Sequence, residues 1–399
     1  MLDLMPVLKP HLPSSADILP YLQAIDERRW YSNGGPLVTQ LEDQLSRRLT
    51  PERDGVGKTG VVTTANATVG LTVALLALGV PAGSLCVMPS WTFAATPHAA
   101  RAAGMKPWFH DVDRQTWALD PDEVRKSLHG IGERVGAVIV VAPFGAPVDM
   151  VAWEAFEDHT GIPVVVDAAA GFDTVRPSRI PSVVSLHATK ILGAGEGGFI
   201  ATADCSLRAR LQACCNFGFQ GTRSAVLAAL NAKMSEYHAA VALASLASWP
   251  TVRQRHIRIA ECYGRHISGL NGCSLQPGYG GGWAASTTSV TLPPHAAAPV
   301  ARSLLRRGLE TRAWWGGGCH EQPAFRDCAR GPLSTTEDLG GRVLGLPHFP
   351  DMDERDVERV AQAVSEALSL EAPRELIAMA QALESPAYGG MAATPGPAR

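Results

Sequence analysis

The chain has 399 residues, of which 46% are hydrophobic and 18% are charged, and its formal net charge is −3. This length allows two domains, or one large α/β domain with a smaller appendage, and the composition is that of a globular protein with a sizeable core. The near-neutral charge argues against nucleic acid or an anionic membrane surface as the main partner.

The N-terminus carries an acid and prolines where a signal peptide would need a basic flank and a long apolar run. The longest apolar stretches have the length of strands and are far too short to span a membrane. We therefore expect a cytosolic protein. The eight cysteines include no Cys-x-x-Cys pair and no set with zinc-ligand spacing, so we expect buried thiols and no metal site.

Strand-like and helix-like segments alternate through the first half of the chain. The strands are continuously apolar, which predicts a mostly parallel sheet that is covered by helices on both faces. The expected strands are residues 60–64, 84–88, 107–112, 136–142, 163–167, 183–187 and 198–202. The expected helices are residues 16–29, 38–49, 69–78, 92–103, 121–128 and 150–160.

Helical patterns dominate the second half. They lie at residues 207–215, 235–248, 251–270, 296–307 and 353–370, with a strand-like stretch at 285–292 and a loop-rich stretch at 314–332. The simplest division is a large domain of residues 1–250 and a smaller α+β domain of residues 251–384. Residues 385–399 are rich in proline, glycine and alanine, so we expect a disordered tail there.

Lys190 stands out among the lysines because a strand-like stretch precedes it and glycines follow at 193, 195, 197 and 198. In such an apolar setting the amine would be partly desolvated, which lowers its pKa and makes it nucleophilic. The alternative is a solvated lysine in a flexible loop, which is the commoner situation for a lysine taken alone.

Asp167 ends one of the apolar strands. An acid at the carboxyl end of a strand in an open α/β sheet points into the crevice where ligands bind. A carboxylate there could pair with a protonated pyridine nitrogen and hold pyridoxal phosphate (PLP) as an electron sink. A helix N-cap role is about equally compatible with the sequence, since Ala-Ala-Ala-Gly follows.

Thr68 and Val69 begin an apolar helix after the first strand. Amides at a helix N-terminus form a cradle for phosphate, although an ordinary cap by Asn66 or Thr68 would have the same pattern. Ser185, five residues before Lys190, could add a phosphate contact or be a plain strand serine.

Two further residues have an open interpretation. Phe93 follows a strand and could stack on a flat ring, although aromatic residues in such places more often pack in the core. Asn231 precedes a helix that Ser235 would cap, and could simply be part of a loop.

Taken together and in this order, these residues resemble the DegT/DnrJ/EryC1/StrS group of fold-type I PLP enzymes, the sugar aminotransferases that act on nucleotide-linked keto-sugars. The resemblance runs from about residue 32 to residue 370 and is strongest over 185–198, Ser-Leu-His-Ala-Thr-Lys-Ile-Leu-Gly-Ala-Gly-Glu-Gly-Gly. Other matching segments are residues 33–38, 65–68, 89–96, 111–113, 144–149, 231–236 and 320–323.

The resemblance implies an α/β fold of type I, with a mostly parallel sheet in the large domain and a smaller α+β C-terminal domain. It implies that Lys190 binds PLP covalently and that Asp167 pairs with the pyridine nitrogen. L-glutamate would give its amino group to the cofactor, which would then aminate a sugar ketone. Lys190 would carry the proton in each half of the reaction.

The resemblance also assigns the remaining cofactor contacts. Phe93 would stack on the cofactor ring, and Thr68, Val69 and Ser185 would hold the phosphate. Asn231 would reach the phosphate from the partner subunit of a homodimer with shared active sites.

Two departures from the family pattern bear on the site. Ala170 stands where the family often has a glutamine that contacts the phenolic oxygen of the cofactor, and residues 215–218 read Cys-Asn-Phe-Gly instead of an Arg-Asn-His-Gly type segment. We therefore expect altered cofactor electronics and fewer contacts to the nucleotide. His320 and Lys233 are candidate substrate contacts, with a packed interdomain loop as the alternative for His320.

The resemblance favours amination of a dTDP-linked 4-keto-6-deoxyhexose for amino-sugar or polysaccharide biosynthesis, while C3 amination and other nucleotides stay open. One alternative is a relative that uses pyridoxamine phosphate to remove the C3 hydroxyl. Those relatives replace the lysine with histidine, so Lys190 argues against this branch. The other alternative is a non-catalytic PLP-binding regulator.

Overall fold

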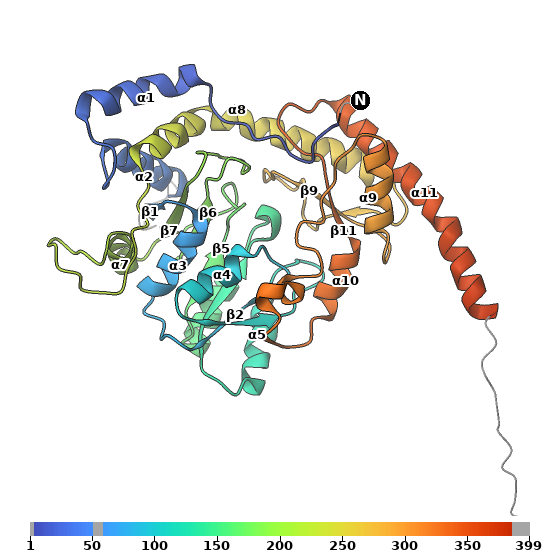
Figure 1. The fold of residues 1–399 in the computed structure, drawn as a ribbon, viewed down its shortest axis with the longest axis horizontal. Coiled ribbons are helices and arrows are strands. Elements are labelled where there is room, and N and C mark those ends of the chain that lie inside the picture. Colours follow the sequence, from blue (N-terminus) through green and yellow to red (C-terminus); the bar gives the residue numbers. More distant parts are fainter. Residues whose placement is uncertain (1–3, 51–58, 385–399) are drawn as a thin grey trace, which may run out of the picture.

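The structure, a computed structural model, describes residues 4–50 and 59–384, so the predicted tail at 385–399 lies outside the described residues. Eight strands form one central sheet: β1 (Gly60–Thr64), β2 (Leu85–Pro89), β3 (Lys106–His110), β4 (Val135–Val141), β5 (Val164–Asp167), β6 (Ser182–Ser185), β7 (Gly198–Thr202) and β10 (Ala329–Arg330). Their order is β1-β7-β6-β5-β4-β2-β3-β10 (Figure 1). Strand β7 runs antiparallel to both of its neighbours, and every other pair in this sheet is parallel.

Helices cover both faces of this sheet, as the sequence predicts. Along β4, Val138 and Val140 belong to one hydrophobic core, while Ala137 and Ile139 belong to the core on the other face. The first core includes residues of α1 (Ser15–Arg28), α2 (Pro36–Leu49), α5 (Pro121–Ser127), α6 (Met150–Thr160) and α8 (Glu236–Ile267). The second includes residues of α3 (Ala67–Ala77), α4 (Ala95–Ala102) and α7 (Cys205–Cys215). Burial on both faces explains why the strands are apolar at consecutive positions.

A second, antiparallel sheet has the order β11-β9-β8, from β8 (Ser274–Leu275), β9 (Thr288–Thr291) and β11 (Val343–Leu346). A third hydrophobic core joins this sheet to α9 (Ala297–Arg306), α11 (Glu354–Glu384) and the C-terminal part of α8. Helix α10 (Ser334–Arg342) lies between β10 and β11 in the sequence. The predicted boundary between the two domains, at residue 250, falls within α8, and the division into two domains stays a prediction.

The prediction of two helices at 235–248 and 251–270 is wrong, because α8 is continuous and contains Pro250. Proline removes one backbone donor and disfavours a helix interior. Here Trp249 and Val252 on either side of it are buried, and this packing outweighs the local preference. The loop-rich stretch at 314–332 contains two short 3-10 turns, Cys319–Glu321 and Pro323–Phe325, and strand β10.

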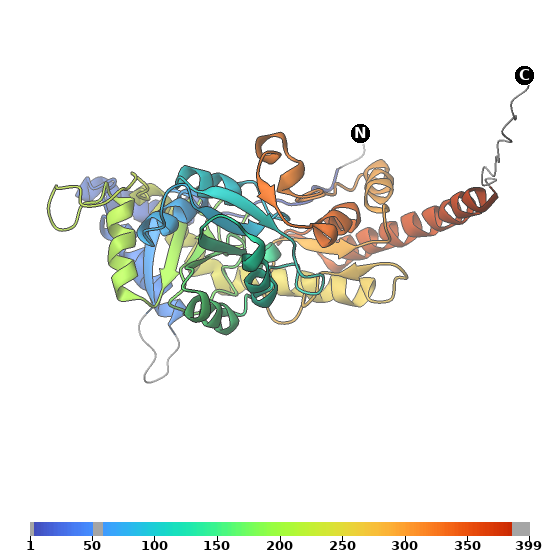
Figure 2. The ribbon, with the colours of Figure 1, turned by 90° about the horizontal axis from the view of Figure 1, so that it is seen from below.

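The last helix is longer than the sequence predicts, since α11 continues beyond residue 370 to Glu384 and projects away from the body in Figure 2. Helix α4 starts three residues later than predicted, at Ala95, because Thr92 lies in a turn in which its amide donates to the Ser90 carbonyl. Within the described part of the chain, every helix is too short or too polar to cross a lipid bilayer.

Candidate active site

Lys190 lies in the loop that joins β6 to β7. The Leu186 amide donates to the Gly197 carbonyl and the Ala188 amide to the Gly195 carbonyl, so the base of the loop is closed by backbone hydrogen bonds. Gly195 has φ +84°, a left-handed conformation that favours glycine. This loop holds the lysine close to the carboxyl end of β6.

Lys190 and Asp167 lie close enough for each to act on the pKa of the other. Burial lowers the pKa of Lys190, and the nearby Asp167 carboxylate partly offsets that effect. Burial also raises the pKa of Asp167, which is 5% exposed, and Lys190 acts in the opposite direction. Among the described residues no direct ion pair joins the two, so each acts on the other through a longer-range electrostatic effect.

A threonine that sequence reasoning missed fixes the Asp167 carboxylate. Thr96 Oγ1 on α4 donates to Asp167 Oδ2 at 2.7 Å, and Ala169 N donates to Oδ1 at 3.2 Å. Thr92 Oγ1 lies 2.9 Å from Thr96 Oγ1 and so continues this chain of hydroxyls. Thr92 precedes α4 and Thr96 lies in its first turn, so no local spacing reveals the contact between Thr96 and Asp167, 71 positions apart.

The start of α3 and Ser185 lie on either side of Gly198. Ser185 at the end of β6 pairs in register with Gly198 of β7. A Cβ atom on Gly198 would lie 2.8 Å from the Ala67 nitrogen, so glycine is needed for the strand to approach the helix N-terminus this closely. The structure therefore brings Ser185 and the first amides of α3 into one neighbourhood, as a phosphate cradle requires.

One amide at the start of α3 already has a side-chain partner. Asn66 is the N-cap, and its Oδ1 accepts from the Val69 amide at 2.9 Å. The cap by Asn66 that the sequence left open is therefore present. Ser185 Oγ accepts from the His187 amide at 3.2 Å, which leaves its own proton for another acceptor.

Phe93 lies at the mouth of a cavity of about 520 Å³ and is 65% exposed. Two aromatic residues, Trp314 and Trp315, line the same cavity with the glycines at 316–318. Trp315 stacks on Phe144 with ring centroids 4.2 Å apart, so its ring is held firmly. An apolar ring with this much exposure is available to a ligand.

Asn231 and Lys233 lie beside the end of β1, where the Ala65 amide donates to the Ala232 carbonyl. Lys233 Nζ donates to Asn231 Oδ1 at 2.7 Å and to Asn216 Oδ1 at 3.0 Å. Asn231 is exposed. Its predicted contact with the cofactor of a partner subunit, and that of Lys233 with substrate, stay predictions.

His320 is largely buried behind the cavity. Its Nδ1 atom lies 2.7 Å from Ser90 Oγ, and its amide donates to the same oxygen at 3.2 Å. Nε2 lies 3.9 Å from a Glu337 carboxylate oxygen. These contacts match the packed interdomain loop that the sequence left open, and a substrate contact by His320 stays a prediction.

These residues fit PLP. The buried Asp167 carboxylate, held by two donors, matches the pyridine nitrogen of the cofactor. The partly buried Lys190 amine near it matches the aldehyde, and the helix start that admits only glycine beside it matches the phosphate. The sheet with one reversed strand and this constellation define the class of fold-type I PLP-dependent aminotransferases.

Comparison with known proteins identifies the family. The model of the DegT/DnrJ/EryC1/StrS aminotransferase family matches residues 14–365, and this chain belongs to that family. The family resemblance and the fold class predicted from the sequence are thereby confirmed.

Three similar proteins illustrate the relationship. A crystal structure of DesI in the presence of its TDP-sugar product has a TM-score of 0.81, with 32% identity and coverage of 96% of each chain. A structure from Bacillus cereus ATCC 10987, assigned as a PLP-dependent aminotransferase, has a TM-score of 0.84, with 29% identity over 90% of this chain and 99% of that one. A UDP-N-acetyl-3-dehydro-α-D-glucosamine 3-aminotransferase from Acidithiobacillus ferrooxidans is 28% identical, covering 79% of this chain and 87% of its own.

Proposed function

We propose that this aminotransferase uses PLP to move an amino group from L-glutamate to the ketone of a nucleotide-linked deoxysugar. The observation that carries the proposal is the proximity of Lys190, which is partly buried, to the buried Asp167, since each group acts on the pKa of the other. Perturbed pKa values in a cleft are typical of catalytic sites.

PLP, when bound, supplies the electron sink and carries the amino group between the two substrates. Lys190 is the anchoring amine and the base. Because burial lowers the pKa of Lys190, a larger fraction of the amine is neutral and able to take a proton from the carbon that bears nitrogen. Asp167, oriented by Thr96, keeps a proton on the ring nitrogen opposite.

The remaining predicted residues would bind and orient the cofactor. The phosphate would be held by the Thr68 amide and hydroxyl and by the Ser185 hydroxyl. The Val69 amide, which donates to Asn66 Oδ1, would add a bond to the phosphate if it exchanged that partner. Phe93, whose side chain is 65% exposed, would stack on the cofactor ring.

The proposed substrate is a dTDP-linked 4-keto-6-deoxyhexose, in a route to an amino sugar or polysaccharide in the cytosol. Support comes from the two relatives whose names include a nucleotide sugar, one with a TDP-sugar product and one acting on a UDP-sugar at C3. The TDP-linked relative is the more similar of the two in sequence identity.

The proposal includes a homodimer with shared active sites, in which Asn231 reaches the partner's cofactor. Exposed aromatic residues support it, since Trp30, Tyr31 and Tyr237 are each about half exposed and Tyr31 stacks on Tyr237 at 6.2 Å. Apolar surface of this kind is typical of an interface.

A screen of nucleotide keto-sugars with L-glutamate, read by mass, tests the function. The expected product is the 4-amino sugar with release of 2-oxoglutarate. A product that has lost its C3 hydroxyl would instead identify a dehydratase. A protein that binds PLP and leaves every amino donor unchanged would identify a regulator.

Mixed dimers test the shared site. Combining Lys190→Ala subunits with Asn231→Ala subunits should produce one fully wild-type pocket and restore part of the activity. Absence of any recovery, with dimers shown by size, would refute the assignment of Asn231 across the interface.

A further inference from the structure

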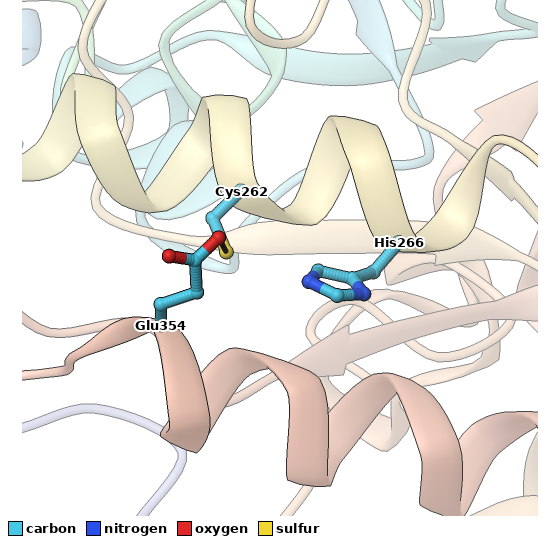
Figure 3. A group of neighbouring side chains, drawn as sticks. All are labelled: Cys262, His266 and Glu354. Atoms are coloured by element: carbon cyan, nitrogen blue, oxygen red, sulfur yellow. Dashed lines mark hydrogen bonds between the residues drawn. The ribbon is translucent and has the colours of Figure 1, made fainter.

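Three potential metal ligands meet where α8 packs against α11, in the C-terminal part of the molecule (Figure 3). Cys262 and His266 are one helical turn apart on α8, so they lie on the same face. Glu354 is the first residue of α11, and its carboxylate points toward Cys262 in Figure 3. One donor atom from each of the three lies within 4.8 Å of the other two.

The donor types suit a particular ion. A thiolate, an imidazole nitrogen and a carboxylate oxygen are the ligands of borderline-soft Zn²⁺. From these positions we propose that Cys262, His266 and Glu354 bind one Zn²⁺ ion, with water as a fourth ligand. This proposal departs from the expectation of no metal site, because Glu354 meets Cys262 and His266 only through the packing of α11 on α8. It is independent of the aminotransferase function.

The geometry needs only small side-chain movements. Metal–ligand lengths of about 2.0–2.3 Å in a tetrahedron place neighbouring donors roughly 3.4–3.6 Å apart. Cys262 Sγ and Glu354 Oε1 are already 3.9 Å apart. A contraction of this size is within reach of rotation about side-chain bonds, particularly for the exposed Glu354.

The surrounding charges favour a cation. The carboxylates of Glu354 and Glu358 both lie close enough to Cys262 to act on its thiol, while Arg265 acts in the opposite direction. The same carboxylates attract a divalent ion. On binding, the thiol proton leaves to solvent as the S–Zn bond forms, so affinity should rise with pH.

Arg265 is the competitor for this site. Its Nη2 atom lies 2.7 Å from Glu354 Oε1, and both side chains are well exposed. Exposed ion pairs of this kind are weak, so a metal ion can displace the guanidinium. Removing the guanidinium should therefore strengthen metal binding, which provides a variant that acts in the opposite direction to loss of a ligand.

The ion would tie the last turns of α8 to the first turn of α11. Residues of both helices, including Tyr263 and Val357, belong to the third hydrophobic core. A ligand that binds only the folded form stabilises it, so the C-terminal part should unfold at a higher temperature with Zn²⁺ present.

Titration of the PLP-loaded full chain with Co²⁺ tests the site. Tetrahedral Co²⁺ with a thiolate ligand absorbs at the red end of the visible spectrum and has a charge-transfer band in the near ultraviolet. We expect both bands, their loss on adding Zn²⁺, and an affinity at least about tenfold lower in Cys262→Ser and His266→Asn. Arg265→Gln should bind more tightly. Cys273→Ser, at a partly buried cysteine of the same core, is the matched control and should bind normally.

Two results would overturn the proposal. One is a Co²⁺ complex without the thiolate band. The other is a spectrum and affinity that Cys262→Ser and His266→Asn leave unchanged although circular dichroism shows both variants to be folded. Amino transfer by the same preparations is a separate readout, so failure of the metal site would leave the proposed function untouched.

Discussion

Replacing Thr96 with valine should disable the Asp167 carboxylate while leaving the shape of the site intact. Valine has nearly the same volume but removes the hydroxyl that donates to Asp167 Oδ2 at 2.7 Å. A hydrogen bond to a charged group contributes about 1.5–3 kcal/mol. If that bond persists in the transition state, its loss lowers kcat by about 10- to 150-fold.

The same change should move the pH dependence in a definite direction. Burial already raises the pKa of Asp167, and the Thr96 hydroxyl lowers it. Without the hydroxyl, the pKa rises further, so the acid limb of the pH profile of kcat moves to higher pH.

Steady-state kinetics across pH, with glutamate and a saturating sugar acceptor, measure both effects. Thr72→Val is the matched control, because Thr72 is a buried threonine of α3 whose hydroxyl donates to backbone carbonyls. The reasoning is refuted if Thr96→Val keeps the wild-type rate and profile, or if Thr72→Val shows the same loss.

Three other substitutions have clear expected outcomes. Burial raises the pKa of Asp167 in the folded protein above its ordinary value of 3.8. The protonated acid therefore favours folding below that ordinary value, and this contribution is lost as pH rises through the raised pKa. Asp167→Asn should stabilise the apoenzyme at pH 7 by about 1–3 kcal/mol in urea unfolding and abolish transfer, with no gain in stability at acid pH. Asp173→Ala leaves Arg48 and Arg253 without their buried partner. It should lower the free energy of unfolding by about 3–5 kcal/mol in the same assay, and a decrease below about 1 kcal/mol would contradict this. Gly198→Ala crowds the start of α3 and should lower the free energy of unfolding by about 1–3 kcal/mol. It should also weaken PLP binding in equilibrium dialysis, and an unchanged PLP affinity would contradict the phosphate assignment.

The sequence predicts the large sheet well, because its central strands β4 and β5 are buried on both faces and almost entirely apolar, and glycines mark several of the turns between elements. Strand β7 shows the limit, since its reversed direction comes from the short loop after Lys190 that returns the chain beside β6. Residue 250 shows another limit, because a proline that ends a helix by local rules lies inside α8 where packing decides.

Sequence patterns suggest candidate site residues one at a time, and they do not reveal contacts between residues that lie far apart in sequence. Lys190 stands out through the glycine-rich segment that follows it, and Asp167 through its position at the end of β5. Thr96 acts through a contact with a residue 71 positions away, which no local pattern reveals. The meeting of Cys262 with Glu354, 92 positions later, likewise depends on how α8 packs against α11.

Borohydride reduction of the PLP-loaded protein, followed by peptide mapping by mass spectrometry, tests the central claim most directly. Reduction fixes the bond between the cofactor and its lysine, so the modified residue identifies the anchor. The account predicts a single modified peptide with the cofactor on Lys190, and its disappearance in Lys190→Ala. Attachment to a different lysine, or an equal yield of modified Lys233, would contradict it.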